Sequence, residues 1–291
     1  MLRKLIPHSR EQMMYKPSLV LSVACLLTVI SLSAAPGAQG QSLNEAPPTD
    51  AAALAKKLSN PVADLVSVPF QLNYDEGYGP NDAGIWRLNI QPVIPITLNE
   101  DWNVISRTIV PVVLDQEAFA STLDDENGLG DIVQSLFLSP KEPTARGWIW
   151  GVGPVFNLPT ASQDVLGTEK WAAGPTVVLL KQEKGWTYGV LANHLWSFAG
   201  DDDRDQINAT FLQPFLSYTF PSALTVVLNT ESTYNWDTDD WTIPINLQAN
   251  QMMRFGKQPV QLGLGGRWYA ETPDGGPEWG ARFNLVFLFP K

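Results

Sequence analysis

The sequence has almost no cysteine and almost no histidine. Cys25 is its single cysteine, and His8 and His194 are its two histidines. A disulfide framework requires several cysteines, and a cysteine or histidine metal centre requires several such ligands. The composition therefore excludes both kinds of site, and we expect no metal and no cofactor.

Long apolar runs are absent after residue 40, so a membrane helix is excluded there, and a membrane-spanning chain would have to be a barrel. Before that point, basic residues in 1–16 precede the apolar run PSLVLSVACLLTVISLSAA and a set of small residues. This order predicts a secretory signal peptide at 1–40, cleaved near Ala38-Gln39-Gly40. An uncleaved membrane anchor is the alternative, because the run is almost long enough to span a bilayer.

Basic residues are scarce in the rest of the chain. Residues 1–40 hold four of the 19 basic residues and one of the 30 acidic residues, which leaves 15 against 29 and a net charge of −14. Such a chain has no basic surface to neutralise phosphates, so nucleic acid is excluded as a partner.

Residues 41–64 differ in composition from everything after them and are predicted to be a periplasmic N-terminal segment. Asp50 is a suitable N-cap for a short helix, and Asn60-Pro61 would end it. The apolar side of this helix would consist of Ala51, Leu54, Ala55 and Leu58.

From residue 65 onward the helical period disappears, and segments of about 10 residues are separated by clusters of Gly, Pro, Asp and Asn. The final segment, EWGARFNLVFLFPK, places Phe283 and Phe287 on one side and Arg282 and Asn284 on the other, because side chains alternate along a strand. We predict twelve strands, near 65–74, 85–97, 102–114, 130–139, 148–158, 171–181, 186–197, 207–220, 224–234, 241–251, 260–270 and 279–289.

Some residues fit these strands poorly. Ile105 shares a side with Arg107, and Gln134 shares a side with Leu136. Proline cannot donate to a strand ladder, so bulges or strand ends must absorb the prolines inside the predicted strands. These are Pro69, Pro92, Pro95, Pro111, Pro154, Pro175, Pro214 and Pro244.

The connections alternate in length. NED, EKG and GKQP are short, whereas DEGYGPNDAG, DQEAFASTLDDENG and FAGDDDRDQ are long and polar, and most tryptophans fall near predicted strand ends. This pattern is typical of an outer-membrane barrel with short periplasmic turns, longer external loops and aromatic girdles. We therefore predict an all-β, transmembrane, antiparallel up-and-down β-barrel of about 12 strands over 65–291. It would lie in the cell outer membrane and contact its lipids and lipopolysaccharide.

Several longer phrases resemble one bacterial family. LNEDWNVISRTIVPV, GWIWGVGPVFNLPTA, QPFLSYTF and PDGGPEWGARFNLVFLFPK are similar to phrases of an outer-membrane β-barrel transporter family that includes phenol-degradation-pathway outer-membrane proteins. The resemblance covers residues 60–291 and implies passage of small, hydrophobic or aromatic solutes, but it supplies no catalytic residues. The aromatic last strand also resembles the signal that the barrel-assembly machinery recognises, although Pro290-Lys291 follow it.

Two features could carry other chemistry. His194 stands beside a girdle tryptophan, Trp196, and a histidine outside a barrel could belong to a lipase, but no serine can be assigned to it. The acidic loop 201–205 spaces its acids like a calcium loop, yet Gln206 and Leu212 occupy positions that need glycine and a bidentate acid. A solvated external loop is the preferred interpretation, and a weak divalent site that bridges lipid phosphates is the alternative.

Polar side chains on the faces opposite the apolar ones should point into the lumen. Charges inside a membrane span are costly unless they are paired or wetted, so they tend to mark a pathway. The lumen or constriction residues are predicted to be Arg87, Arg107, Glu231, Arg267 and Arg282. The hypothesis is a partly basic constriction, neutralised in part by Glu231, and the alternative is a structural arginine ladder.

The sequence as a whole favours an outer-membrane channel or transporter that passes small solutes through a polar lumen, with no catalytic residues. Two alternatives remain open: a lipase-like barrel enzyme centred on His194, and a structural or adhesive barrel with a closed lumen.

Overall fold

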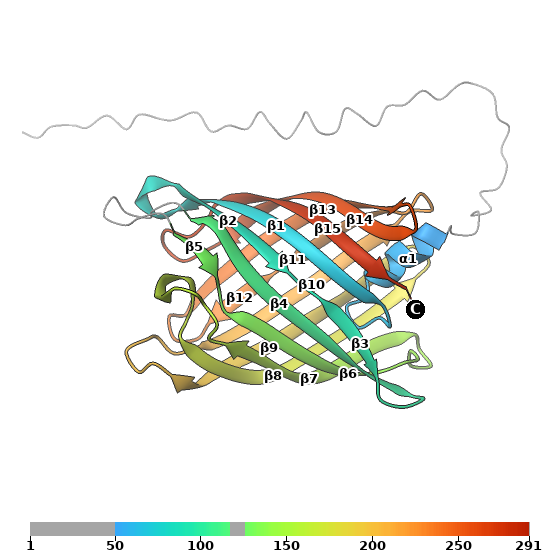
Figure 1. The fold of residues 1–291 in the computed structure, drawn as a ribbon, viewed down its shortest axis with the longest axis horizontal. Coiled ribbons are helices and arrows are strands. Elements are labelled where there is room, and N and C mark those ends of the chain that lie inside the picture. The colour runs from blue at the N-terminus through green and yellow to red at the C-terminus, as the bar shows by residue number, and fades with distance from the viewer. Residues whose placement is uncertain (1–49, 117–125, 291) are drawn as a thin grey trace, which may run out of the picture. The chain divides into compact units, whose positions relative to one another are not determined.

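The computed structural model describes residues 50–116 and 126–290, which form one α-helix and an antiparallel sheet that closes on itself (Figure 1). The predicted signal peptide and residues 41–49 of the predicted N-terminal segment lie outside the described residues, as does most of the loop after the third predicted strand. No helix in the described ranges is long and apolar enough to cross a membrane.

The elements follow one another with short connections at one end of the barrel and longer ones at the other. In chain order they are α1 (Asp50–Leu58), β1 (Val66–Tyr78), β2 (Ala83–Ile90), β3 (Val93–Thr97), β4 (Trp102–Gln116), β5 (Glu126–Leu129), β6 (Ile132–Pro140), β7 (Trp148–Leu158), β8 (Lys170–Glu183), β9 (Trp186–Gly200), β10 (Asn208–Thr219), β11 (Leu224–Thr230), β12 (Ser232–Asn235), β13 (Asp240–Phe255), β14 (Gln258–Glu271) and β15 (Trp279–Phe289). Short 3-10 turns cover 79–81 and 164–166.

These fifteen strands make twelve spanning segments, as the sequence predicts. β2 and β3 both pair with β1 and β4, and β11 and β12 both pair with β10 and β13, so each couple is one interrupted span. β5 and β6 likewise both pair with β4. The interruptions fall at 91–92, 130–131 and 231.

The barrel closes between its first and last strands. β1 runs antiparallel to β15 over eleven rungs, from Val66 opposite Phe289 to Glu76 opposite Trp279. The even number of spans brings the end of β15 back to the side where β1 begins, and the same end carries the short turns (Figure 1). The predicted closure of the last strand against the first is confirmed.

Prolines are absorbed at irregular points of the sheet. Pro92 lies in the break between β2 and β3, and the register of β13 shifts beside Pro244. Pro154 of β7 stands directly opposite Pro175 of β8, which confines two missing N–H donors to one rung. These positions show how a closed ladder tolerates residues that cannot donate.

Two glycines allow unusually close approach between neighbouring strands near that rung. A Cβ on Gly153 would lie 1.8 Å from the carbonyl oxygen of Leu136, and a Cβ on Gly174 would lie 1.8 Å from that of His194. Any larger residue would force the backbones apart, so glycine is required here for close contact rather than for a turn.

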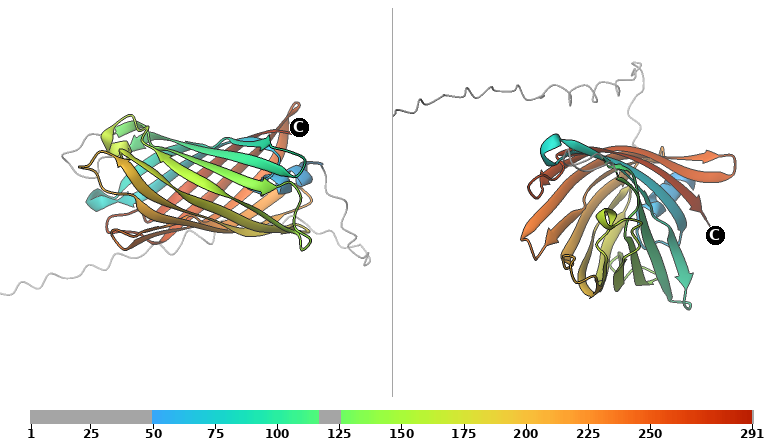
Figure 2. Two further views of the ribbon diagram at one scale, coloured as in Figure 1. Left: turned by 90° about the horizontal axis from the view of Figure 1, so that it is seen from below. Right: turned by 60° about the vertical axis from the view of Figure 1, so that its left-hand side comes forward.

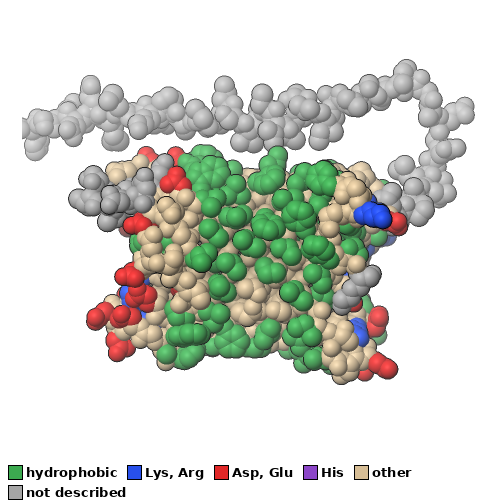
Figure 3. Space-filling view, in the orientation of Figure 1, with side chains coloured by type: hydrophobic (Ala, Val, Ile, Leu, Met, Phe, Trp, Pro, Cys, Tyr) green, Lys and Arg blue, Asp and Glu red, His purple; other side chains and the backbone are tan. Residues whose placement is uncertain are grey.

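The outward faces of the strands are apolar between aromatic ends. In Figure 3 hydrophobic side chains cover the middle of the visible face, while acidic side chains gather toward its ends, chiefly where the long loops lie. Ring pairs mark both ends: Trp102 with Trp150 at the end of the short turns, and Tyr74 with Trp86 at the other. This is the girdle pattern that a membrane-spanning barrel requires.

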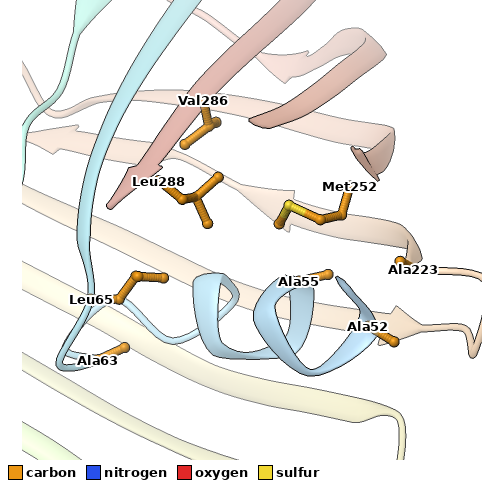
Figure 4. Close-up of a cluster of buried hydrophobic side chains, with 8 residues drawn as sticks. All are labelled: Ala52, Ala55, Ala63, Leu65, Ala223, Met252, Val286 and Leu288. Carbon is orange, nitrogen blue, oxygen red and sulfur yellow. The ribbon is translucent and has the colours of Figure 1, made fainter. Parts of the chain in front are cut away.

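Helix α1 lies at the end of the barrel where β15 finishes (Figures 1 and 2). Ala52 and Ala55 are buried against the inner sides of β13 and β15, where they meet Met252 and Leu288 (Figure 4). Alanine is the best helix former and lets a helix approach closely, so the DAAALAKKL sequence suits a narrow site. A helix was expected in this segment; the structure adds that it packs against the inner wall.

Candidate functional site

The lumen holds a cavity with a volume of about 520 Å³. One side is rich in amides, among them Gln71 on β1, Gln248 on β13 and Asn284 on β15. Apolar groups also line the cavity, including Phe211 on β10 and Leu195 on β9. The cavity is therefore amphiphilic: its lining can donate and accept hydrogen bonds and can also contact apolar surface.

Three of the five residues predicted to line the lumen or constriction lie in the lining of this cavity, namely Arg107, Glu231 and Arg282, whereas Arg87 and Arg267 do not. The lining also includes Asn193, Asn229, Gln248 and Asn284. The amides bond to one another across strands. Asn284 donates to Gln248 Oε1 at 2.6 Å, and Gln91 donates to Gln71 Oε1 at 3.2 Å.

Arg282 and Glu231 form a bidentate ion pair. Arg282 Nη1 and Nη2 donate to the two carboxylate oxygens of Glu231, each at 2.8 Å, and Nε donates to Asn73 Oδ1 at 2.7 Å. The fork of a guanidinium matches a carboxylate in this way, and the residue is only 3% exposed. Glu231 reaches inward from the break between β11 and β12, so the interruption of that span helps to place the acid.

Arg267 is neutralised by a residue that the sequence patterns did not single out. Its Nη1 donates to Asp75 Oδ2 at 3.0 Å, its Nε donates to Asn246 Oδ1 at 3.2 Å, and Tyr269 OH donates to Asp75 Oδ1 at 2.9 Å. Asp75 is two residues after the inward-facing Asn73 and hence on the same face, but it stands in the phrase DEGYGPNDAG, which was assigned to a loop.

The two arginines and two acids form one cluster. Arg267 Nη2 lies 3.8 Å from Glu231 Oε2, which links the Arg282–Glu231 pair to the Arg267–Asp75 pair. The four formal charges sum to zero. This part of the lumen therefore holds fixed, paired charges, and it has less free positive charge than the partly basic constriction that the sequence suggests.

Among the described residues, the other two arginines make no ion pair with this cluster, although Arg107 lines the same cavity as Glu231. Arg87 lies on β2 opposite Asn73, one strand further round the wall. Arg107 lies on β4, where its Nη2 donates to Gln91 Oε1 at 3.1 Å. Within the described ranges, no carboxylate lies at ion-pair distance from the Arg107 side chain.

The end of the lumen with the short turns is occupied by α1 and the residues that follow it. Leu58 of the helix lines the cavity, so the helix forms part of its floor. Gln182 Nε2 on β8 donates to the backbone oxygen of Lys56 at 2.8 Å. Val62 packs into a second apolar cluster with Ile105 and Phe137 on the far wall. We call residues 50–65 the plug, because they contact opposite walls of the barrel.

His194 lies among the aromatic residues of the external girdle. Its ring lies 3.9 Å from that of Trp196, and its Nδ1 is 2.7 Å from Thr210 Oγ1. The same hydroxyl accepts a hydrogen bond from Trp236 Nε1 at 2.8 Å. The Thr210 hydroxyl thus links β9, β10 and the residue that follows β12.

The external loops are held by their own polar contacts. Asp131 accepts hydrogen bonds from the backbone of Thr160, Ala161 and Thr168, and so ties the loop after β7 to the break before β6. In the acidic loop, Asp201 Oδ1 accepts from the backbone of Asp203. No group of three potential ligands among the described residues is placed to hold a metal ion.

Comparison with known proteins places the chain among outer-membrane β-barrels. A family model described as "Putative MetA-pathway of phenol degradation" matches residues 87–242, which is more than half of the chain. No curated protein matches the chain in sequence.

Three solved structures are similar in fold. An outer membrane channel from Pseudomonas putida F1 is 17% identical, with a TM-score of 0.61, over 77% of this chain and 94% of that one. An outer membrane phospholipase from Salmonella typhi is 13% identical, with a TM-score of 0.43, over 76% and 90%. Outer membrane phospholipase A from Escherichia coli is 12% identical, with a TM-score of 0.44, over 76% and 96%. The channel likeness establishes the fold, and the two phospholipase scores are too low to support an argument about chemistry.

Proposed function

Because the chain belongs to the MetA-pathway phenol-degradation family, we propose that it is an outer-membrane channel that passes small solutes, including hydrophobic or aromatic compounds. The observation that carries this proposal is the amphiphilic cavity inside the barrel, whose mixed apolar and amide lining suits compact solutes with a polar group. We also propose that the protein is not an enzyme, since the environment of His194 is that of a girdle residue.

The plug makes passage conditional. The cavity ends on α1, so a solute that crosses the barrel must displace the helix or pass a rearranged plug. The helix is held by small buried alanines, by a hydrogen bond from Gln182 Nε2 to the backbone oxygen of Lys56, and by one from Lys56 Nζ to the backbone oxygen of Lys184, which is a modest set of contacts compared with the closed sheet around it. We therefore propose that the plug restricts passage at the periplasmic end of the channel.

Replacing Ala55 by Glu tests the channel and its plug together. Ala55 is fully buried against Leu288 and Met252, and an unpaired carboxylate cannot remain in that apolar site without a large desolvation cost. We expect Ala55→Glu to release the helix and to raise the liposome-swelling rate severalfold for small sugars, benzyl alcohol and benzoate.

Ala53→Glu is the matched control, because Ala53 is on the exposed side of the same helix and should leave the rates unchanged. If liposomes with the wild type and with Ala55→Glu stay sealed to every solute, the protein is a structural barrel with a closed lumen. Phospholipid hydrolysis that is lost in His194→Ala would instead support the lipase alternative.

A further inference from the structure

Arg107 stands at the junction between the lumen and the plug. It lines the main cavity and also two smaller ones of about 200 Å³ and 140 Å³. The larger of these, here called the inner chamber, has Ser59 and Pro61 of the plug on one side and strand residues on the other. A solute that reaches the inner end of the lumen would therefore meet Arg107 next to the plug.

Among the described residues, the charge of Arg107 is not neutralised by an ion pair, unlike the charges of Arg267 and Arg282. Arg267 and Arg282 each contact a carboxylate, whereas among the described residues the Arg107 side chain bonds to the amide oxygen of Gln91. A guanidinium carries five N–H donors and favours planar, bidentate acceptors. A partly buried guanidinium that meets one neutral acceptor retains donors for an anionic ligand.

Two further polar groups of the inner chamber also lack partners. Ser217 is 4% exposed and Asn229 is 9% exposed, and neither Ser217 Oγ nor Asn229 Oδ1 has a hydrogen-bond partner among the described residues. Both side chains line the inner chamber with Arg107 and Gln213. Buried polar atoms are seldom left unpaired, so these groups point to a polar ligand: Ser217 Oγ–H can donate to a ligand oxygen, whereas Asn229 Oδ1 can only accept, from water or from a donor on the ligand.

The rest of the chamber wall is apolar. Val93, Leu191, Phe215 and Val227 complete its lining. A ligand that suits the chamber has a compact apolar body and one anionic group, since the apolar wall stabilises the first and the guanidinium the second.

We propose that the inner chamber binds small organic carboxylates, with the carboxylate on Arg107 and the apolar body on the wall around Phe215. This inference rests on the proposed channel function, because it assigns a preferred class to the solutes that enter the lumen. The proposed site also lies against the plug, so a bound solute would contact Ser59 and Pro61 at the point where the plug restricts passage.

The test compares two ligands with the same ring. Calorimetric titration of the purified barrel with benzoate and with benzyl alcohol separates the carboxylate from the apolar body. We expect the wild type to bind benzoate at least tenfold more tightly, and Arg107→Gln to abolish that preference. Arg254→Gln, which changes an exposed arginine at the end of β13, should behave like the wild type.

Asn229→Asp provides a second test that keeps the shape of the side chain. A carboxylate at this position would pair with Arg107 in the chamber and should eliminate benzoate binding in a folded barrel. This variant decides the question if Arg107→Gln does not fold. Equal binding of the two ligands by the wild type, or benzoate binding that persists in Asn229→Asp, would overturn the proposal.

Swelling measurements separate this proposal from the channel itself. Benzoate binding with liposomes sealed to every solute would refute the channel and leave the carboxylate site in place. Swelling at equal rates and equal binding for both ligands would support the channel and overturn the carboxylate site.

Discussion

For Arg282, the sequence predicts which way the side chain points but not which residues it contacts. Strand alternation in EWGARFNLVFLFPK predicts that it points into the lumen, and in the structure it lines the cavity. Its contacts with Glu231 and Asn73 come from strands far away in sequence, and periodicity carries no information about which polar groups meet across a barrel. Asp75 was missed for a related reason, because a polar phrase that contains glycine and proline looks like a loop even when the strand continues into it.

Removing the charge of Glu231 should cost stability and free an arginine. Glu231→Gln leaves Arg282 and Arg267 with one carboxylate between them, and loss of one member of a buried ion pair costs about 3 kcal/mol. We expect a lower urea midpoint of unfolding in lipid vesicles and a shift of the reversal potential toward anions in planar bilayers.

Glu271→Gln serves as the control for this change, since Glu271 is exposed at the end of β14. Its unfolding free energy should stay within about 0.5 kcal/mol of the wild type. An equally stable Glu231→Gln barrel with unchanged ion preference would mean that the charge cluster is not a determinant of the lumen.

At the scale of elements, the twelve spans follow from the sequence, while their irregularities follow from the plug and from side-chain contacts. β4 alternates poorly because its inward-facing Ile105 packs against Val62 of the plug, which the pattern of β4 alone cannot reveal. Gln134 lies beside Leu136 on the outer face because its amide donates to Ser106 and accepts from Thr108. The alternation rule assumes that polar side chains face a hydrated lumen and that apolar side chains face lipid. The two exceptions, Ile105 and Gln134, each have a specific partner.

The close approach of β8 and β9 provides an element-scale prediction. Gly174→Ala would place a Cβ at 1.8 Å from the carbonyl oxygen of His194, so the two backbones must separate, at a cost of about 1–3 kcal/mol for overpacking. We expect a smaller fraction of heat-modifiable, folded barrel on gels after refolding.

Gly266→Ala is the comparison, because a Cβ on Gly266 meets nothing within 4 Å. It should refold as well as the wild type. Equal refolding of both variants would show that the β8–β9 contact is looser than the backbone geometry indicates.

At the scale of the whole molecule, the outer surface divides into a membrane band and two aqueous ends. Leu264 lies in the middle of β14 and Phe198 near the external end of β9, and both are 67% exposed. Because the two side chains are equally exposed but lie at different depths along the barrel, substitutions at these positions separate the effect of the bilayer from that of the protein. The acidity of the chain, concentrated toward the ends, and its apolar strands thus belong to different layers (Figure 3).

An arginine at each of these two positions tests the band. Leu264→Arg should destabilise the barrel by about 2–4 kcal/mol in lipid vesicles, because a charge would face the bilayer midplane. Phe198→Arg should cost only about 0–1 kcal/mol, because it lies near the interface. Equal costs in urea titrations would place the membrane band elsewhere on the barrel.

Closure between β1 and β15 also constrains the order of the assembly steps. β1 cannot complete its pairing with β15 until Phe289, two residues from the end, has reached it. This pairing joins the strands that are farthest apart in sequence, so we expect it to form last. The plug precedes β1 in the chain and would have to be in position before this step or enter afterwards through the periplasmic mouth. Whether the plug enters before or after β1 pairs with β15 therefore determines whether the newly closed barrel already contains its plug.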